Sequence, residues 1–174
     1  MALATSDLKV RPMKDDGNCL FRALADQMWN DPSRHVEVRA RICQHLQDNR
    51  ARYEAFTDED FEGYVAHMAC DGTYGTQLEI TAFAESYDCP VYVYSDETPE
   101  QGPLLLYHGD VADASTRPVT ARLSFHRGNH YNSVVPLSAP SDPMAGLPQA
   151  CPFCGEAQAD LDLHFATKHS ELFG

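Results

Sequence analysis

The sequence has 174 residues, of which 43% are hydrophobic, enough for one compact core and a small appendage. Its formal net charge is −13, which argues against a protein that binds DNA or RNA through the phosphates. Residues 54–116 contain no Lys or Arg and fourteen acidic side chains. This stretch suggests a partner that is basic where it docks, although an evenly solvated acidic surface explains the same composition.

The first residues carry Asp7, Lys9 and Arg11 in place of an apolar run, so no secretory signal is expected. No stretch of 18 apolar residues occurs, so no contact with a membrane is expected either. Six cysteines in such a chain favour a reducing compartment over a disulfide framework. We therefore expect a cytoplasmic protein, with the nucleus as the other location.

The first half of the chain shows four amphipathic helical patterns. They cover residues 19–29, 33–47, 61–69 and 80–87. In the second pattern Val36, Ala40 and Cys43 share one face, which we expect to lie in the core. Cys70 and Cys89 end or begin other predicted segments and are expected in the core as well.

After Tyr87 the hydrophobic period changes to that of strands. Four short β-branched or aromatic runs, bounded by Pro, Gly, Asp and Asn, cover residues 90–94, 104–107, 122–126 and 131–135. Helices followed by strands predict an α+β domain in which helices cover a sheet. Residues 137–150 are rich in Pro and Ser, have no apolar period, and indicate a semi-rigid linker to a separate unit at 151–174.

A candidate nucleophile stands in the run Asp-Asp-Gly-Asn-Cys-Leu-Phe-Arg-Ala at residues 15–23. The turn delivers Cys19 to the first position of a helix, where free N–H groups and the helix dipole favour a thiolate and can hold an oxyanion. A cysteine nucleophile needs a base and a group that orients the base. His130 begins the last predicted strand, and period-2 alternation puts Asn132 on the same face, where its oxygen can accept the imidazole N–H.

Residues 16–23, together with His-Tyr-Asn-Ser-Val at 130–134, resemble the motifs of the ovarian-tumour (OTU) deubiquitinase family of cysteine proteases. The resemblance covers residues 8–136. Residues 73–80 resemble a third block of that family, from whose Trp-Gly-Gly pattern Tyr74 and Thr76 depart. The resemblance implies an OTU-like α+β fold, with a small, mostly antiparallel central sheet flanked by helices.

The same resemblance implies the roles of the site residues. Cys19 is the nucleophile, His130 the general base and Asn132 the third member of the triad, with Asp16 a residue of the catalytic loop. The implied reaction is thiol-dependent hydrolysis of peptide or isopeptide bonds at the C-terminal glycine of ubiquitin or a ubiquitin-like modifier, without a catalytic cofactor. His126, on the neighbouring predicted strand, is the competitor of His130 for the role of base.

The last 24 residues carry a second pattern, Cys151-x2-Cys154-x9-His164-x4-His169. Two thiolates and two imidazoles are a ligand set that tetrahedral, structural zinc takes, although two unrelated pairs in a tail would look the same. The nine-residue gap is shorter than the ~12 residues of nucleic-acid fingers. The unit is more similar to the compact zinc fingers that bind ubiquitin.

Two other classes of function stay open at this stage. A non-catalytic ubiquitin-binding scaffold could keep the same fold, but a degenerate protein of that kind should have lost Cys19, His130 or Asn132. A zinc-dependent nucleic-acid binder has only the C-terminal pattern in its favour, and the acidic charge argues against it.

Overall fold

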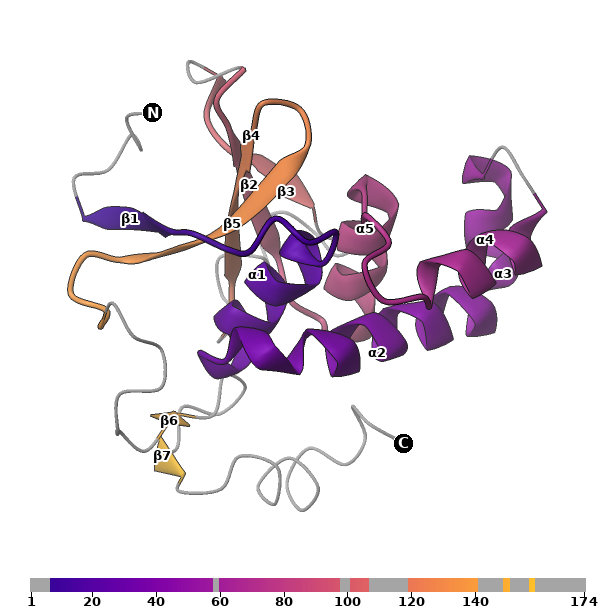
Figure 1. Cartoon of the computed structure of the whole chain (residues 1–174), viewed down its shortest axis with the longest axis horizontal. Helices are drawn as coiled ribbons and strands as arrows, with labels where there is room; N and C mark the ends of the chain where they lie inside the picture. The colour runs from indigo at the N-terminus through magenta and orange to yellow at the C-terminus, as the bar shows by residue number, and fades with distance from the viewer. Residues whose placement is uncertain are drawn as a thin grey trace.

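Five strands form one mixed sheet in the computed structural model, which describes residues 7–57, 60–97, 101–106 and 119–140 and the backbone of 149–150 and 157–158 (Figure 1). The strands are β1 (Leu8–Arg11), β2 (Val91–Ser95), β3 (Leu104–Leu106), β4 (Ala121–His126) and β5 (His130–Pro136). Their order across the sheet is β1-β5-β4-β2-β3. The pairs β1–β5, β5–β4 and β2–β3 are antiparallel, whereas β2 and β4 run parallel. The α+β class is therefore confirmed, with a sheet that is mixed.

Within the described residues, five α-helices accompany the sheet. They are α1 (Cys19–Trp29), α2 (His35–Asp48), α3 (Arg50–Tyr53), α4 (Phe61–Met68) and α5 (Gln77–Ser86), with single 3-10 turns at Pro32–Arg34 and Glu54–Phe56. Helix α1 packs against β5 and β4 on one side and against α2 on the other (Figure 1). Helices α3 and α4 lie beside the far part of α2, away from the sheet (Figure 1).

The position of α1 follows from its composition. Nine of its eleven residues are buried, including the fully enclosed Leu20, Phe21 and Leu24. A helix that is apolar nearly all round is stable only when other elements cover it on most sides. Cys19, the first residue of α1, therefore belongs to a helix that is almost entirely buried.

The buried face of α2 differs from the predicted one. Val36 is 59% exposed and Ala40 is exposed, whereas Val38, Ile42 and Leu46 are fully buried. The prediction was wrong because two polar residues, His35 and Arg39, belong to the buried face and obscure its period. Cys43 is buried as expected.

Two further expectations need correction. Cys70 is exposed rather than in the core, because it lies in the turn that follows α4, whereas Cys89 is buried as predicted. Strand β1 was not predicted. It has two basic residues in four and forms by pairing with β5, from Leu8 opposite Pro136 to Arg11 opposite Ser133.

The C-terminal unit falls mostly outside the described residues. Within it, the short strands β6 (Gln149–Ala150) and β7 (Ala157–Gln158) pair antiparallel. The predicted zinc ligands Cys151, Cys154, His164 and His169 lie outside the described residues. In the described part of the chain, no helix is long and apolar enough to cross a membrane.

Candidate active site

The segment before α1, here named the Cys19 loop (residues 15–18), makes a tight turn. Gly17 has φ +76°, a conformation that favours glycine. A Cβ atom at Gly17 would lie 1.8 Å from the carbonyl oxygen of Gly72. The Cys19 loop therefore rests directly against the connection between α4 and α5, here named the Gly72 loop (residues 69–76).

Asp16 shapes the Cys19 loop. Its Oδ1 accepts a hydrogen bond from the backbone N–H of Asn18 at 3.1 Å, and its Oδ2 pairs with Nη2 of Arg22 at 2.8 Å. The hydrogen bond from Arg22 holds the pKa of Asp16 below its ordinary value. Asp16 thus ties the turn to the first turns of α1, and its partners among the described residues belong to that loop and helix.

The Cys19 side chain is enclosed, with 1% of the residue exposed. Burial raises the pKa of the Cys19 thiol, and hydrogen bonding to the backbone of Tyr131 and Leu20 acts in the opposite direction with a smaller effect. The Asp15 carboxylate adds to the rise in pKa by repelling a thiolate. Burial therefore outweighs the effect expected from the helix N-terminus, and the resting sulfur needs a base to remove its proton.

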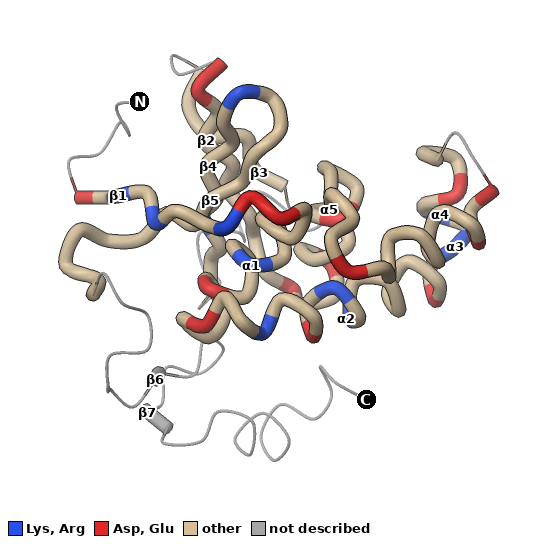
Figure 2. The backbone as a smooth tube through the Cα atoms, viewed as in Figure 1, with Lys and Arg blue, Asp and Glu red and all other residues tan. Residues whose placement is uncertain are grey.

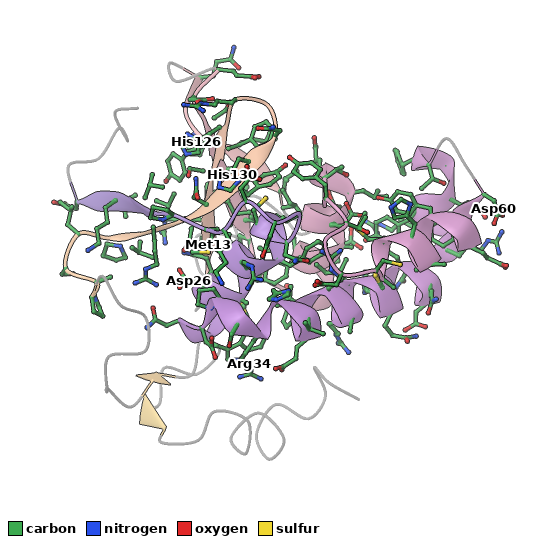
Figure 3. All side chains as sticks on the ribbon, in the orientation of Figure 1. Met13, Asp26, Arg34, Asp60, His126 and His130 are labelled. Carbon is green, nitrogen blue, oxygen red and sulfur yellow. The ribbon has the colours of Figure 1, made fainter. Side chains whose placement is uncertain are left out.

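His130 and Asn132 lie on the same face of β5, as their spacing predicts. Nε2 of His130 is 3.1 Å from Oδ1 of Asn132. Figure 3 shows His130 at the start of β5 and Met13 in the segment between β1 and α1. The backbone N–H of Met13 donates to the same Oδ1 at 2.7 Å.

The shared oxygen determines which nitrogen of the neutral His130 imidazole carries the proton. The atom that faces Met13 N–H must be an acceptor, so it is the oxygen of the Asn132 amide and not the nitrogen. An oxygen accepts, so Nε2 of His130 carries the proton and Nδ1 holds the free lone pair. Nδ1 is buried and has no hydrogen-bond partner among the described residues; Oδ1 of Asp15 lies 3.6 Å away. The geometry leaves Nδ1 as the basic nitrogen.

His126 has different partners. It lies opposite His130 in the β4–β5 register. Its Nε2 is 2.8 Å from Oγ of Ser124, and its Nδ1 is 3.4 Å from a carboxylate oxygen of Asp96. Both ring nitrogens are thus engaged by side chains of β4 and of the turn after β2, whereas His130 faces Asn132.

Comparison with known proteins agrees with this geometry. The family model described as OTU-like cysteine protease matches residues 14–131. The chain belongs to the OTU-like cysteine protease family. It is 38% identical over 127 residues to the OVARIAN TUMOR DOMAIN-containing deubiquitinating enzyme 6 of Arabidopsis thaliana, covering 73% of this chain and 24% of that protein. It is 37% identical over 165 residues to human OTU domain-containing protein 5, covering 93% of this chain and 28% of that protein.

The chain therefore spans about a quarter of the length of these curated relatives. Among solved structures, an OTU domain in complex with ubiquitin has the same fold, with a TM-score of 0.64 at 20% identity. That match covers 76% of this chain and 72% of the other.

Several groups in this OTU domain could not be found by sequence reasoning. The N–H groups of Met13, Tyr131 and Leu20 are backbone donors, which no residue type signals. Arg39 is buried beneath the Cys19 loop, although the helical pattern gave no sign of it. These groups became visible only with the packing of α1 and α2 and the pairing of β1 with β5.

The acidic stretch at 54–116 divides into internal and external groups. Glu79 is buried and completes a capping box with Thr76 at the start of α5, and Glu85 accepts a hydrogen bond from Tyr53 at 2.7 Å and pairs with Arg52 at 2.6 Å. Figure 2 shows other acidic positions at the α3–α4 end of the molecule and at the tip of β2 and β4. The described residues contain no group of three or more His, Cys, Asp or Glu side chains that could hold a metal ion.

Proposed function

We propose that this OTU domain is a deubiquitinase that hydrolyses peptide or isopeptide bonds at the C-terminal glycine of ubiquitin or a ubiquitin-like modifier. The proposal rests on the shared Asn132 oxygen, which leaves Nδ1 of His130 free to act as a base for Cys19, a buried thiol at the start of α1. Two comparisons support the substrate class. One relative is named a deubiquitinating enzyme, and one structure of the same fold is a complex with ubiquitin.

The reaction begins with proton transfer from the Cys19 thiol to Nδ1 of His130. The resulting thiolate attacks the glycine carbonyl, and backbone N–H groups of the Cys19 loop and the start of α1 hold the oxyanion. His130 then gives its proton to the departing lysine amine, which leaves a thioester on Cys19. Water that has lost a proton to His130 attacks the thioester, and the thiol and the free carboxylate are regenerated.

Asn132 and Asp16 have supporting roles in this scheme. Asn132 holds the Nε2–H of His130 and so fixes the imidazole plane and tautomer. Because its amide is neutral, it adds no negative charge to stabilise the imidazolium, and we expect a lower rate than with a carboxylate at this position. Asp16 keeps the turn in which the oxyanion donors lie.

The decisive experiment uses a panel of ubiquitin dimers and a ubiquitin with a C-terminal electrophile. We expect the probe to modify Cys19 only, and Cys19→Ala to abolish both labelling and cleavage while the chain stays folded. Cys70→Ala is the matched control, because its thiol is exposed and belongs to the turn after α4. A folded chain that is not labelled, or undiminished turnover by Cys19→Ala, would refute hydrolysis; ubiquitin binding without labelling would support the scaffold alternative.

We also propose that Cys151, Cys154, His164 and His169 bind one structural zinc ion in a C-terminal finger that adds affinity for the ubiquitin substrate. The ligand types and the acidic composition of residues 151–174 support this proposal over a nucleic-acid finger. Metal analysis should find one zinc per chain, lost in Cys151→Ser. Deletion of residues 137–174 should raise KM, and an unchanged KM would leave the finger a structural role alone.

A further inference from the structure

Arg39, in the middle of α2, is a buried cation beneath the Cys19 loop. It is 3% exposed, and its guanidinium lies 3.7 Å from the centroid of the Phe21 ring in α1. Its Nη1 donates to the carbonyl oxygen of Met68 at 2.8 Å, and its Nη2 donates to the carbonyl oxygen of Thr73 at 2.8 Å and to Oδ1 of Asn18 at 2.7 Å. One side chain thus joins α4, the Gly72 loop and the Cys19 loop.

Stability alone does not account for this arginine. No carboxylate forms an ion pair with it among the residues that the structure describes, and its Nε has no hydrogen-bond partner there. Burial lowers the pKa of Arg39, which reflects the cost of removing the guanidinium from water. Well-packed apolar side chains at buried ionic positions often give equal or greater stability. The buried Arg39, held by carbonyl oxygens, therefore indicates that the positions of the segments it contacts must be fixed.

Arg39 fixes the orientation of the Asn18 side chain. An Asn at the position before a helix ordinarily accepts a hydrogen bond from an N–H of the first turn. The side chain of Asn18 makes no such capping bond, because its oxygen accepts from Arg39 and, at 3.0 Å, from the backbone N–H of Gly72. The N–H of Leu20, one of the groups that a capping oxygen would take, is therefore left without a side-chain cap.

The Gly72 loop also contacts the base side of the site. The ring of Tyr74 stacks on that of Tyr131, with centroids 6.1 Å apart, and Tyr131 lies between His130 and Asn132 in β5. Hydrogen bonding to the Tyr131 backbone also lowers the pKa of Cys19, against the larger effect of burial. Arg39, through the carbonyl of Thr73, therefore holds a loop that contacts both the Cys19 loop and the strand that carries His130.

We propose that Arg39 is a positioning residue for the nucleophile: it keeps the Asn18 oxygen away from the start of α1 and clamps the Cys19 loop to the Gly72 loop. The first-turn N–H groups thereby stay free of a side-chain cap and available to the thiolate and to the oxyanion that forms beside it. This inference rests on the proposed hydrolase function. It assigns to α2 a part in catalysis without any contact between α2 and the substrate.

The test measures kcat and KM of the full chain on a ubiquitin C-terminal amide substrate. We expect Arg39→Met to lower kcat about 100-fold, the effect of a displacement of ~1 Å in a reacting group, with KM changed less than about twofold. Asn18→Ala should lower kcat about tenfold, and should add less than about twofold in the Arg39→Met background, because both changes break one clamp.

Arg34→Met is the matched control. Arg34 also covers an aromatic ring, that of Trp29 at 4.3 Å, and pairs with Glu37. It lies beside the last residue of α1, at the end opposite Cys19. We expect its kcat to stay within about twofold of the unaltered chain. Thermal melts give the folded fraction of every variant, so that kcat is expressed per folded molecule. If Arg39→Met does not fold, Arg39→Lys and Asn18→Ala carry the same comparison.

Folded Arg39 and Asn18 variants with unchanged kcat, or a loss of kcat that follows the folded fraction, would overturn the proposal. Independent, multiplicative effects of the two substitutions would overturn it as well. An unaltered chain that does not turn over the substrate would instead refute the hydrolase function itself.

Discussion

The Cys19 loop and the first residues of β5 carry the two halves of the site, and they are held in different ways. The Cys19 loop is fixed by side-chain bonds from Asp16 to Arg22 and from Asn18 to Arg39 and Gly72. The His130 imidazole, in the described part of the chain, has a single hydrogen bond, to Asn132. The proposed nucleophile is thus positioned by the interior of the fold, whereas the proposed base depends on one amide oxygen.

The contrast continues in the backbone on either side. The Cys19 loop leads into a buried helix, whereas His130 follows an exposed turn in which Arg127 and Gly128 have φ of +53° and +70°. This difference indicates that the His130 side chain is less constrained than the Cys19 loop. Substitution of the His130 side chain itself should therefore change the rate with little change in stability, whereas substitutions in the Cys19 loop should change both.

The largest expected effect separates the two histidines of the β4–β5 hairpin. His130→Ala should lower kcat/KM about 10³-fold, because it removes the group that takes and returns the proton. His126→Ala should change it less than about threefold, because that ring is bonded to Ser124 and Asp96. Steady-state kinetics with a ubiquitin amide substrate distinguishes them, and full activity of His130→Ala would contradict the assignment of the base.

Asn132→Ala tests the single hydrogen bond on which the base depends. We expect kcat to fall about 10²-fold, because the imidazole loses its orientation. The change also leaves the buried N–H of Met13 without its acceptor, at a cost of about 1–3 kcal/mol in the free energy of unfolding. Kinetics and urea denaturation measure the two effects. Unchanged stability would contradict the role of Met13, and unchanged kcat that of Asn132.

The enclosure of Cys19 predicts a strong pH dependence of its alkylation. Burial raises the pKa of this thiol, so the thiolate is a minor species at neutral pH and its fraction increases about tenfold per pH unit below the pKa. Iodoacetamide labelling followed by mass spectrometry between about pH 6 and about pH 10 measures this rise. The peptide with the exposed Cys70 is the control for access of the reagent. A labelling rate at Cys19 that does not vary with pH would show a preformed thiolate and contradict the prediction.

The smallest effect concerns the acidic stretch. If its exposed carboxylates attract a basic surface of ubiquitin, KM should rise about threefold between roughly 50 and 500 mM salt, with kcat nearly constant. Glu79 is buried, and Glu85 is half-buried and bonded to Tyr53 and Arg52, so neither makes such a contribution. A KM that does not depend on salt would leave the acidic stretch as a solvated surface.

The geometry within each half of the candidate site could be predicted because each half is local in sequence. A nucleophile at a helix start and two strand residues of the same face are set by periods of 3.6 and 2, and the structure places His130 and Asn132 in hydrogen-bond contact as predicted. The α+β class followed from the change of period after Tyr87. The long helices α1, α2 and α5 were found because their apolar residues repeat over two turns or more.

The rest depends on contacts between distant segments. Strand β1 alternates two apolar with two basic residues over only four positions, too short a run to predict a strand, and its Arg11 is buried with Asp26 of α1 as its ion-pair partner. The face of α2 was misplaced because Arg39 is buried through bonds to Asn18, Met68 and Thr73, none of which is near it in sequence. A buried polar residue cannot be recognised until its partners are known.

The close approach of Gly17 and Gly72 has a consequence for the sequences that this fold tolerates. Both glycines have a positive φ. A Cβ at Gly17 would lie 1.8 Å from the carbonyl oxygen of Gly72, which no side chain can accommodate. A Cβ at Gly72 would lie 3.5 Å from its nearest neighbour, the carbonyl oxygen of Asp16, which is an ordinary contact. Asn and Asp adopt such a φ at modest cost, so position 72 has room for them and position 17 has none. In a library of random variants, position 17 should therefore remain Gly, whereas position 72 should also accept Asn and Asp.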